Sequence, residues 1–359
     1  NLQLNMAMKI LNLFAIVISF FTYTQTIQNS SANIKKISDT TKVIQLNNQA
    51  FRSRLINPDI TISEANKALK LAVKINYING IAESYRVIGV GNSYKNSIDT
   101  AIENYLNALS YFKRNKNLEG EAKVYNNIGN LYRDIDYNKS LENFEKSLKI
   151  ATKLNIRDLI AGLKLNIGTA YQQRKNFPKA LTYYQESLSM FKILENKIGI
   201  IQSHQNLGVL YLNLRDFKSA EGHLIEALKK SKEEKLNNSI AAINLTLSSV
   251  HIAQSRFDEA EKTIEEGLKY AELLEDSKLV RNYTLTSFEL ESKRKNYFKA
   301  LTYLRKAYRD DSAKFVNNIS DKISLLEAQH IQLEKQKENE LTIAKQKNTQ
   351  LFLWASIAI

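Results

Sequence analysis

A pattern of small and aromatic residues returns about every 40 positions along most of this 359-residue chain. Gly129, Gly168 and Gly208 each follow an asparagine and one aliphatic residue, and they lie 39 and then 40 positions apart. A tyrosine stands three residues after each of these glycines. One aromatic residue follows in the next turn of each copy, at Tyr137, Phe177, Phe217, Phe257 and Tyr297. Any fold of this chain must therefore use one structural unit several times.

The repeated unit is predicted to be a pair of helices. Each copy continues with a small, a bulky and a second small residue, as at Ala180, Tyr184 and Ser187. Two amphipathic stretches in a repeat of this length predict a helix-turn-helix unit, which cannot bury its apolar face alone and must stack on its neighbours. The glycine lets the first helix approach its partner closely, and the small residue does the same on the second helix. No strand-like alternation competes with this reading.

The turns and the weaker copies agree with this division. Asn176 precedes Pro178, which places an N-cap before a proline in the first helical turn, and Asp216 stands at a comparable turn. Other copies are less regular, because Ser248 and Phe288 replace the glycine. Residues 81–115 keep Gly89, and a degenerate copy is expected over residues 37–76, marked by Ala65, Leu69 and Ala72. The repeats then number about seven and extend over residues 37–312.

This arrangement of small and large residues resembles the tetratricopeptide (TPR) family, whose pattern is met nearly in full by residues 160–235. The period is longer than the usual 34 or so residues, and the family's closing proline is absent. The resemblance implies an all-α fold, a TPR-type α-solenoid of about seven helical hairpins. It says little about function, because a fold is only a platform for function.

The composition excludes several kinds of chemistry. There is no cysteine, so thiolate catalysis, disulfides and thiolate zinc sites are absent. The four histidines are assigned to different repeats or to the terminal helix, and none forms a helical His-Glu metal motif. The net charge is +14, but acidic residues are interleaved with the lysines along nearly every segment. This argues against direct contact with nucleic acid. The sequence therefore predicts no catalytic residues, no metal and no cofactor in this region.

Both ends of the chain differ from the repeats. Residues 10–21 are apolar and are followed by small and polar residues, which predicts a signal peptide over residues 1–24. The alternative is an apolar helix that packs on the fold. Residues 351–359 are apolar throughout, and a spanning helix needs about 20 such residues. We interpret them as the start of a truncated transmembrane helix.

Residues 313–350 contain no glycine or proline and are predicted to form one long helix leading to the membrane. Ile323, Leu326, His330 and Leu333 follow three-four spacing, as in a short coiled-coil seam. Parallel dimerisation to a homodimer is one prediction from this spacing. The other is a single solvated helix packed back on the last repeat.

Together these segments resemble the extracytoplasmic sensor region of bacterial TPR-containing sensor histidine kinases, or of membrane-anchored LuxR-type regulators, found especially in Bacteroidetes. The resemblance implies a bacterial inner-membrane protein with a periplasmic TPR region. Whether the whole protein is an enzyme depends on an output domain, such as a histidine kinase, that these residues do not contain. Two other hypotheses stay open: a membrane-tethered scaffold for protein-protein interactions, and a soluble cytosolic peptide receptor.

The TPR resemblance also implies a binding surface. In such solenoids the first helix of each pair lines a concave groove, and primary amides there can both donate and accept hydrogen bonds toward an extended peptide backbone. Asparagine ladders grip peptides in some TPR proteins. The predicted groove residues are Asn127, Asn130, Arg133, Asn166, Gln172 and Asn206. We expect a peptide or protein partner, although asparagine can also simply suit this helix surface.

Overall fold

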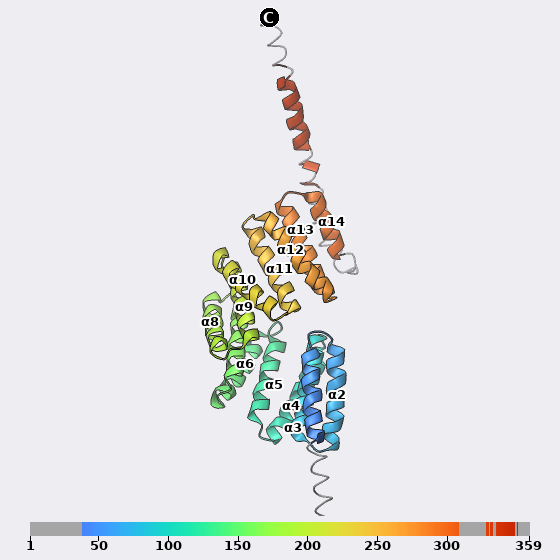
Figure 1. Ribbon diagram of the computed structural model, residues 1–359, viewed down its shortest axis with the longest axis vertical. Helices are drawn as coiled ribbons and strands as arrows, with labels where there is room; N and C mark the ends of the chain where they lie inside the picture. The colour runs from blue at the N-terminus through green and yellow to red at the C-terminus, as the bar shows by residue number, and fades with distance from the viewer. Residues whose placement is uncertain (1–37, 309–327, 330, 333–334, 349, 351–359) are drawn as a thin grey trace, which may run out of the picture. The chain divides into compact units, whose positions relative to one another are not determined.

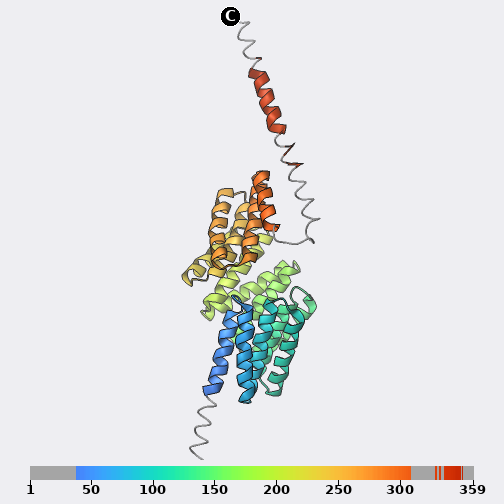
Figure 2. The same ribbon diagram turned by 90° about the vertical axis from the view of Figure 1, so that its right-hand side faces the viewer.

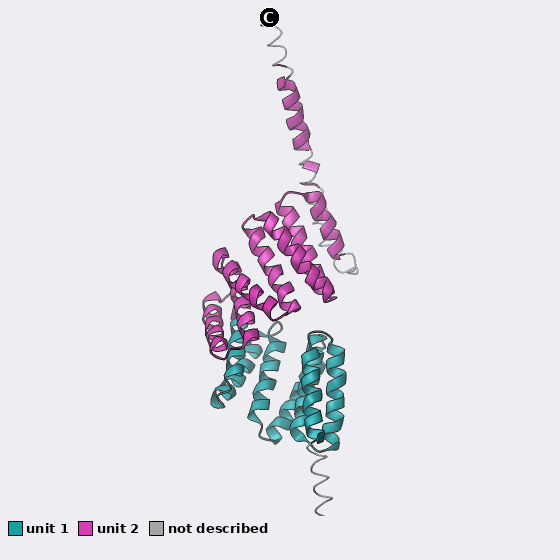
Figure 3. Cartoon of the chain, in the orientation of Figure 1, with its two compact units in different colours: residues 1–170 teal, residues 171–359 magenta. Residues whose placement is uncertain are grey.

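The computed structural model describes residues 38–308, 328–329, 331–332, 335–348 and 350 (Figure 1). Within these residues the regular structure is helical and contains no strand. The chain divides into two compact units, Asn1–Ala170 and Tyr171–Ile359, shown in different colours in Figure 3. Each unit is described by itself below.

The first unit is a series of antiparallel helical hairpins (Figure 1). Its helices cover residues 38–53, α2 (Pro58–Lys74), α3 (Ile78–Tyr94), α4 (Ile98–Arg114), α5 (Leu118–Tyr132), α6 (Tyr137–Lys153) and α7 (Arg157–Gln173), the last of which ends just inside the second unit. Neighbouring helices pack on one another, as α3 does on α4 and α5 on α6. The hairpins therefore match the predicted repeat copies one by one.

The second unit continues the same pattern, seen from another side in Figure 2. Its helices are α8 (Phe177–Ile193), α9 (Lys197–Asn213), α10 (Phe217–Glu233), α11 (Asn237–Ala253), α12 (Phe257–Leu273), α13 (Ser277–Lys293) and α14 (Tyr297–Tyr308). A further helix covers residues 335–348, and each of these residues is exposed.

The 40-residue period comes from helices and turns of nearly constant length. Most helices contain 17 residues, as α8 and α9 do, and the three residues Leu194, Glu195 and Asn196 separate these two. The middle turn residue has a positive φ, 53° at Glu195. Comparable positive φ values recur about every 20 residues at Asn76, Asn96, Lys116, Asn155, Lys175, Arg215, Lys235, Ser255, Glu275 and Lys295. This left-handed residue ends most of the helices after the same number of turns, whereas α5 contains 15 residues and has no such residue after it.

The predicted helix caps are confirmed. Asn176 Oδ1 accepts a hydrogen bond from the backbone N–H of Lys179 at 3.4 Å, with Pro178 in the first turn of α8. Asp216 Oδ1 accepts from the backbone N–H of Ser219 at 3.1 Å. Each of these side chains satisfies a backbone donor that the helix leaves without a partner.

In several hairpins the core depends on a glycine that faces a large side chain on the second helix. A Cβ atom at Gly129 would lie 2.6 Å from Phe144 Cδ1, and one at Gly89 would lie 2.6 Å from Tyr105 Cδ1. Both aromatic side chains are almost fully buried. The predicted close approach of the first helix to the second is therefore confirmed.

Serine takes the small position in one hairpin and adds polar links between its helices. Ser140 Oγ donates to the carbonyl of Gly129 at 2.7 Å, and Ser147 Oγ donates to the carbonyl of Ala122 at 2.7 Å. Both hydroxyls are buried. Because a buried hydroxyl without a partner is costly, these bonds explain why serine can stand where other copies have alanine.

The degenerate first copy is also confirmed. The helix over residues 38–53 and α2 form a hairpin in which Ala50, Ala65 and Ala72 are fully buried. These alanines replace the glycine and small residues of the regular copies. The first hairpin therefore nests in the same way without a glycine.

The expectations for the chain ends fall on residues outside the described ranges. These are the signal peptide over 1–24, the membrane entry over 351–359 and the seam of Ile323, Leu326, His330 and Leu333. Among the described helices, none combines the length and apolar character needed to cross a bilayer. Dimerisation through the seam stays a prediction.

The glycine contact gives a direct test of the fold. Replacing Gly129 with alanine forces a methyl group against the Phe144 ring, and we expect a loss of about 1–3 kcal/mol of stability. Gly162 is the matched control, because a Cβ there would meet nothing within 4 Å; its change to alanine should add about 0.5–1 kcal/mol. Thermal unfolding followed by circular dichroism measures both changes. Equal effects at the two glycines would contradict the nesting described here.

In the turns, by contrast, we expect that adding a glycine increases the stability of the fold. Lys235 has a φ of 54° in the turn between α10 and α11. Lys235→Gly should stabilise the chain by about 1 kcal/mol, because glycine adopts this conformation without a Cβ penalty. Lys229→Gly, an exposed site inside α10, should instead destabilise it by about 1 kcal/mol. The melting temperatures of the two variants should move in opposite directions.

Candidate functional site

The first helices of the hairpins form the inner side of each unit. Contacts that skip the intervening helix join α3 with α5 in the first unit, and join α9 with α11 and α11 with α13 in the second. Helices that touch in this way lie on the shorter side of a stack of hairpins. The face predicted to bind a partner is therefore the face that these first helices line.

Four of the predicted groove residues lie in the first unit and are half-buried: Asn127 and Asn130 on α5, Arg133 at its C-cap, and Asn166 on α7. Asn166 Nδ2 donates a hydrogen bond to Asn126 Oδ1 at 2.9 Å, so that one amide bridges two successive first helices. Asn126 is not among the predicted residues. In the repeat register Asn166 corresponds to Asn127, 39 positions earlier, so the period gave no signal for Asn126.

Beside this amide pair, the Asn127 side chain has an unsatisfied donor. Its Nδ2 atom is buried and has no hydrogen-bond acceptor within the described part of the chain. A buried amide without a partner costs roughly 1–3 kcal/mol. At the far end of α5, Arg133 Nε lies 3.8 Å from Asp134 Oδ1, a loose ion pair. Polar groups on this helix are therefore held in place before any ligand is considered.

The other two predicted residues, Gln172 and Asn206, lie in the second unit and are also half-buried. Gln172 Oε1 accepts a hydrogen bond from the Tyr184 hydroxyl of α8 at 2.8 Å. The Gln172 side chain therefore links the two helices of its own hairpin. Its role in a groove, like that of Asn206, stays a prediction.

The first unit also holds a cavity that the sequence did not predict. It has a volume of about 210 Å³, and the helix over residues 38–53, α3 and α5 contribute to its wall. Polar lining residues include Asn47, Glu83, Asn117 and Lys123. Lys123 lies one helical turn before Asn126 on the same face of α5, because residues three apart are neighbours on a helix. The cavity wall and the amide pair thus share one face of α5.

The charge in this cavity is fixed by a buried ion pair. Arg86 holds Glu83 with two hydrogen bonds, of 2.6 and 2.9 Å, and its guanidinium lies 5.0 Å from the centre of the Phe51 ring. Burial on its own would raise the pKa of Glu83, but attraction and hydrogen bonding from Arg86 outweigh it and lower this pKa. Glu83 therefore presents a fixed carboxylate.

An amide next to this carboxylate has one free side. Asn47 Nδ2 donates to Ser84 Oγ at 3.0 Å, whereas Asn47 Oδ1 is buried without a hydrogen-bond donor among the described residues. The cavity thus combines amides, a carboxylate and a lysine. Such a wall suits a ligand that alternates donors and acceptors, and it offers no set of groups for catalysis.

In the second unit, two histidines come together, contrary to the expectation that the histidines stand in different repeats. His204 on α9 and His223 on α10 belong to one hairpin, and their Nδ1 atoms lie 2.9 Å apart. Tyr211 stacks on His223 with 5.4 Å between ring centres. Burial, then His223 and Lys192, lower the pKa of His204 to about 4, and burial also lowers the pKa of His223. The pair is therefore neutral at pH 7.

Comparison with known proteins identifies the repeat. Residues 159–233 match the family model described as "Tetratricopeptide repeat". These residues are therefore similar to tetratricopeptide repeats. A curated relative, Response regulator aspartate phosphatase I of Bacillus subtilis, is 39% identical over 64 residues. That match covers 18% of this chain and 16% of the relative's length, so it concerns a short part of each protein.

Solved structures extend the likeness in fold over most of the chain. A Rap protein complexed with Competence and Sporulation Factor has a TM-score of 0.55 at 17% identity, covering 80% of this chain and 99% of its own. The apo form of the quorum sensor NprR from B. thuringiensis has a TM-score of 0.56 at 14% identity, covering 83% and 91%. At such identities the likeness shows the fold, an all-α TPR-like solenoid.

The histidine pair predicts a pH dependence of stability. The unfolded chain binds a proton at each histidine near pH 6.5, whereas folded His204 binds one only near pH 4. Between these values the unfolded state holds more protons, so stability falls as the pH falls from 6.5 to 4, by about 1–3 kcal/mol. His204→Gln should flatten this part of a plot of melting temperature against pH. An unchanged slope in the variant would assign the acid sensitivity to other groups.

Proposed function

We propose that this TPR region is a receptor for an extended peptide, or for an extended segment of a partner protein, bound along the first helices. The observation that carries the proposal is the buried, unsatisfied amide of Asn127 next to the Asn126–Asn166 amide bridge. An extended backbone presents C=O and N–H groups at regular intervals, and primary amides can pair with both. A bound carbonyl would supply the acceptor that Asn127 Nδ2 lacks.

The relatives support a regulatory role of this kind. NprR in complex with its cognate peptide NprX has a TM-score of 0.54 at 14% identity and covers 84% of this chain. The shared fold therefore belongs, in that protein, to a regulator that binds a peptide. The phosphatase named in the curated relative is not carried over, because the match covers only 16% of that protein.

We further propose that the region is the sensor part of a membrane-anchored bacterial signal-transduction protein, with the repeats on the extracytoplasmic side of the inner membrane. The apolar segments at residues 10–21 and 351–359 support this placement. A histidine kinase or a LuxR-type regulator would be the output. For a bound peptide to alter that output, it must bind one conformation of the receptor more tightly than another.

Peptide binding can be tested on the full chain with a displayed library of unstructured peptides. For a selected peptide, Asn166→Ala should weaken the affinity about tenfold, because it breaks the amide bridge and removes one or two hydrogen bonds. Asn143→Ala is the matched control: Asn143 lies on the second helix α6 and bonds its own backbone, at Lys139. Its change should leave the affinity as it is.

Fluorescence anisotropy with a labelled peptide measures these affinities. Equal weakening by both asparagine variants would place the peptide away from the first helices and would overturn the proposed site. Binding of folded proteins but of no peptide would favour a scaffold over a peptide receptor.

A further inference from the structure

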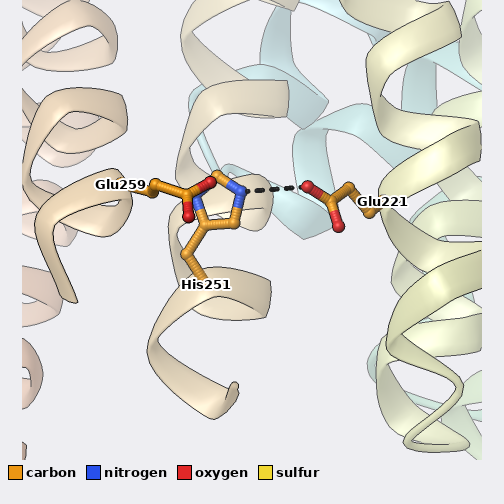
Figure 4. Close-up of side chains that lie close together, drawn as sticks. All are labelled: Glu221, His251 and Glu259. Atoms are coloured by element: carbon orange, nitrogen blue, oxygen red, sulfur yellow. Dashed lines mark hydrogen bonds and ion pairs between the residues drawn. The ribbon is translucent and has the colours of Figure 1, made fainter. Parts of the chain in front are cut away.

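Three acidic and imidazole side chains converge in the second unit. Glu221 comes from α10, His251 from α11 and Glu259 from α12, and their ligand atoms all lie within 4.8 Å of one another. Figure 4 shows the two carboxylates approaching the imidazole from opposite sides. His251 is only 6% exposed, whereas Glu259 is close to the surface. The group thus has one rigid nitrogen and two adjustable oxygens.

His251 replaces a tyrosine of the repeat. It lies 40 positions after Tyr211, at the place that is tyrosine in the three regular copies. In two of those copies this position stacks on a ring of the second helix, as Tyr171 does on Tyr183 and Tyr211 on His223. In this copy the second helix offers Thr263 instead, and the pair changes from a ring contact to a hydrogen bond.

The hydrogen bonds around His251 fit the tautomer that a metal site needs. Thr263 Oγ1 donates its proton to the carbonyl of Glu259 at 2.7 Å. The same oxygen lies 3.2 Å from His251 Nδ1, and in the tautomer with the proton on Nδ1 this nitrogen donates to it. The lone pair of Nε2 is then directed at Glu221 Oε1. A cation between Nε2 and Oε1 would bind both atoms, whereas in its absence the other tautomer lets Nε2–H donate to Glu221.

The distance between the Nε2 atom of His251 and the Oε1 atom of Glu221 fits two ligands of one metal ion. His251 Nε2 and Glu221 Oε1 are 3.4 Å apart, longer than the roughly 2.7–2.9 Å of a charged hydrogen bond. Tetrahedral zinc with bonds of about 2.0–2.1 Å places neighbouring ligand atoms about 3.3–3.4 Å apart. We propose that Glu221, His251 and Glu259 form a binding site for a divalent transition-metal ion of the zinc class, with a fourth position for water.

Arg256 is the group that competes with the metal. Its Nη1 donates to Glu221 Oε2 at 2.8 Å, and its Nε donates to Glu259 Oε1 at 2.8 Å. Glu221 can keep this bond while its other oxygen, Oε1, binds the ion. Glu259 is half exposed and must turn from Arg256 toward the ion. Arg256 also bonds Gln254, at 2.8 Å, which retains the guanidinium after that change.

The donor set selects the type of ion. One imidazole and two carboxylates form a mixed nitrogen and oxygen set, which suits zinc. Calcium takes six to eight oxygen ligands and magnesium keeps mostly water and oxygen. When Nε2 binds the ion, His251 donates its Nδ1–H to Thr263 Oγ1. Metal-bound histidines usually donate their second N–H to a neighbouring acceptor in this way. Zinc-class ions are therefore expected to bind and hard ions are not.

The test uses the full chain, with Zn²⁺ in competition against a chromophoric chelator and Co²⁺ as a spectroscopic probe. The wild type should bind one Zn²⁺ and give the visible bands of tetrahedral Co²⁺. His251→Gln should abolish both signals, and Thr263→Val should weaken binding about 10- to 100-fold. Arg256→Gln should tighten binding about tenfold, because a positive charge next to the ion is removed.

His223→Gln is the matched control, because it removes the other histidine cluster of this unit and should leave Zn²⁺ affinity and the Co²⁺ bands unchanged. Glu259→Gln changes an exposed side chain and tests the site without disturbing the core. The proposal is overturned if the wild type fails to compete for Zn²⁺. Loss of binding in His223→Gln but not in His251→Gln, or weaker binding in Arg256→Gln, would overturn it equally.

Discussion

The contact between glycine on a first helix and a large side chain on its partner determines the rest of the structure. At Gly129 the absence of a side chain lets the Phe144 ring lie against the helix backbone, and Gly89 accommodates Tyr105 in the same way. Because interiors are packed as densely as organic crystals, such a contact fixes the separation of two helices to within a few tenths of an ångström. The next hairpin then meets a surface of constant shape. Turns of nearly constant length, most of them with one left-handed residue, repeat that surface about every 40 positions.

This contact explains why the fold could be predicted from the sequence. The prediction needed only the spacing of Gly129, Gly168 and Gly208 and of the small residues that follow. The helices, their caps and the degenerate first copy followed from that spacing, because each hairpin must nest in the same way. The amide face was predicted only from resemblance, and Asn126, which completes the amide bridge with Asn166, was missed. Side-chain pairing between neighbouring copies depends on rotamers that the repeat period leaves undetermined.

The histidine pair could have been found from the sequence, but the cavity could not. His204 lies four residues before Gly208, and His223 lies three residues after Ala220, which faces that glycine. In an antiparallel hairpin these offsets place the two imidazoles opposite one another. The repeat register alone was therefore sufficient to predict the pair. The cavity beside Asn47 is different, because three hairpins contribute to its wall and its volume is what their side chains leave unfilled.

One position of the register shows how a repeat acquires different chemistry without changing its fold. Tyr171 meets Tyr183, Tyr211 meets His223, and His251 meets Thr263, each pair 40 positions after the last. The backbone geometry of the three hairpins is the same, so only the side chains differ. A ring stacked on a ring gains dispersion and little else. An imidazole that pairs with a threonine at Nδ1 instead presents Nε2 to the preceding hairpin, where Glu221 lies. A polar site can therefore arise at one step of a solenoid while the glycine and alanine contacts continue to hold the neighbouring hairpins together.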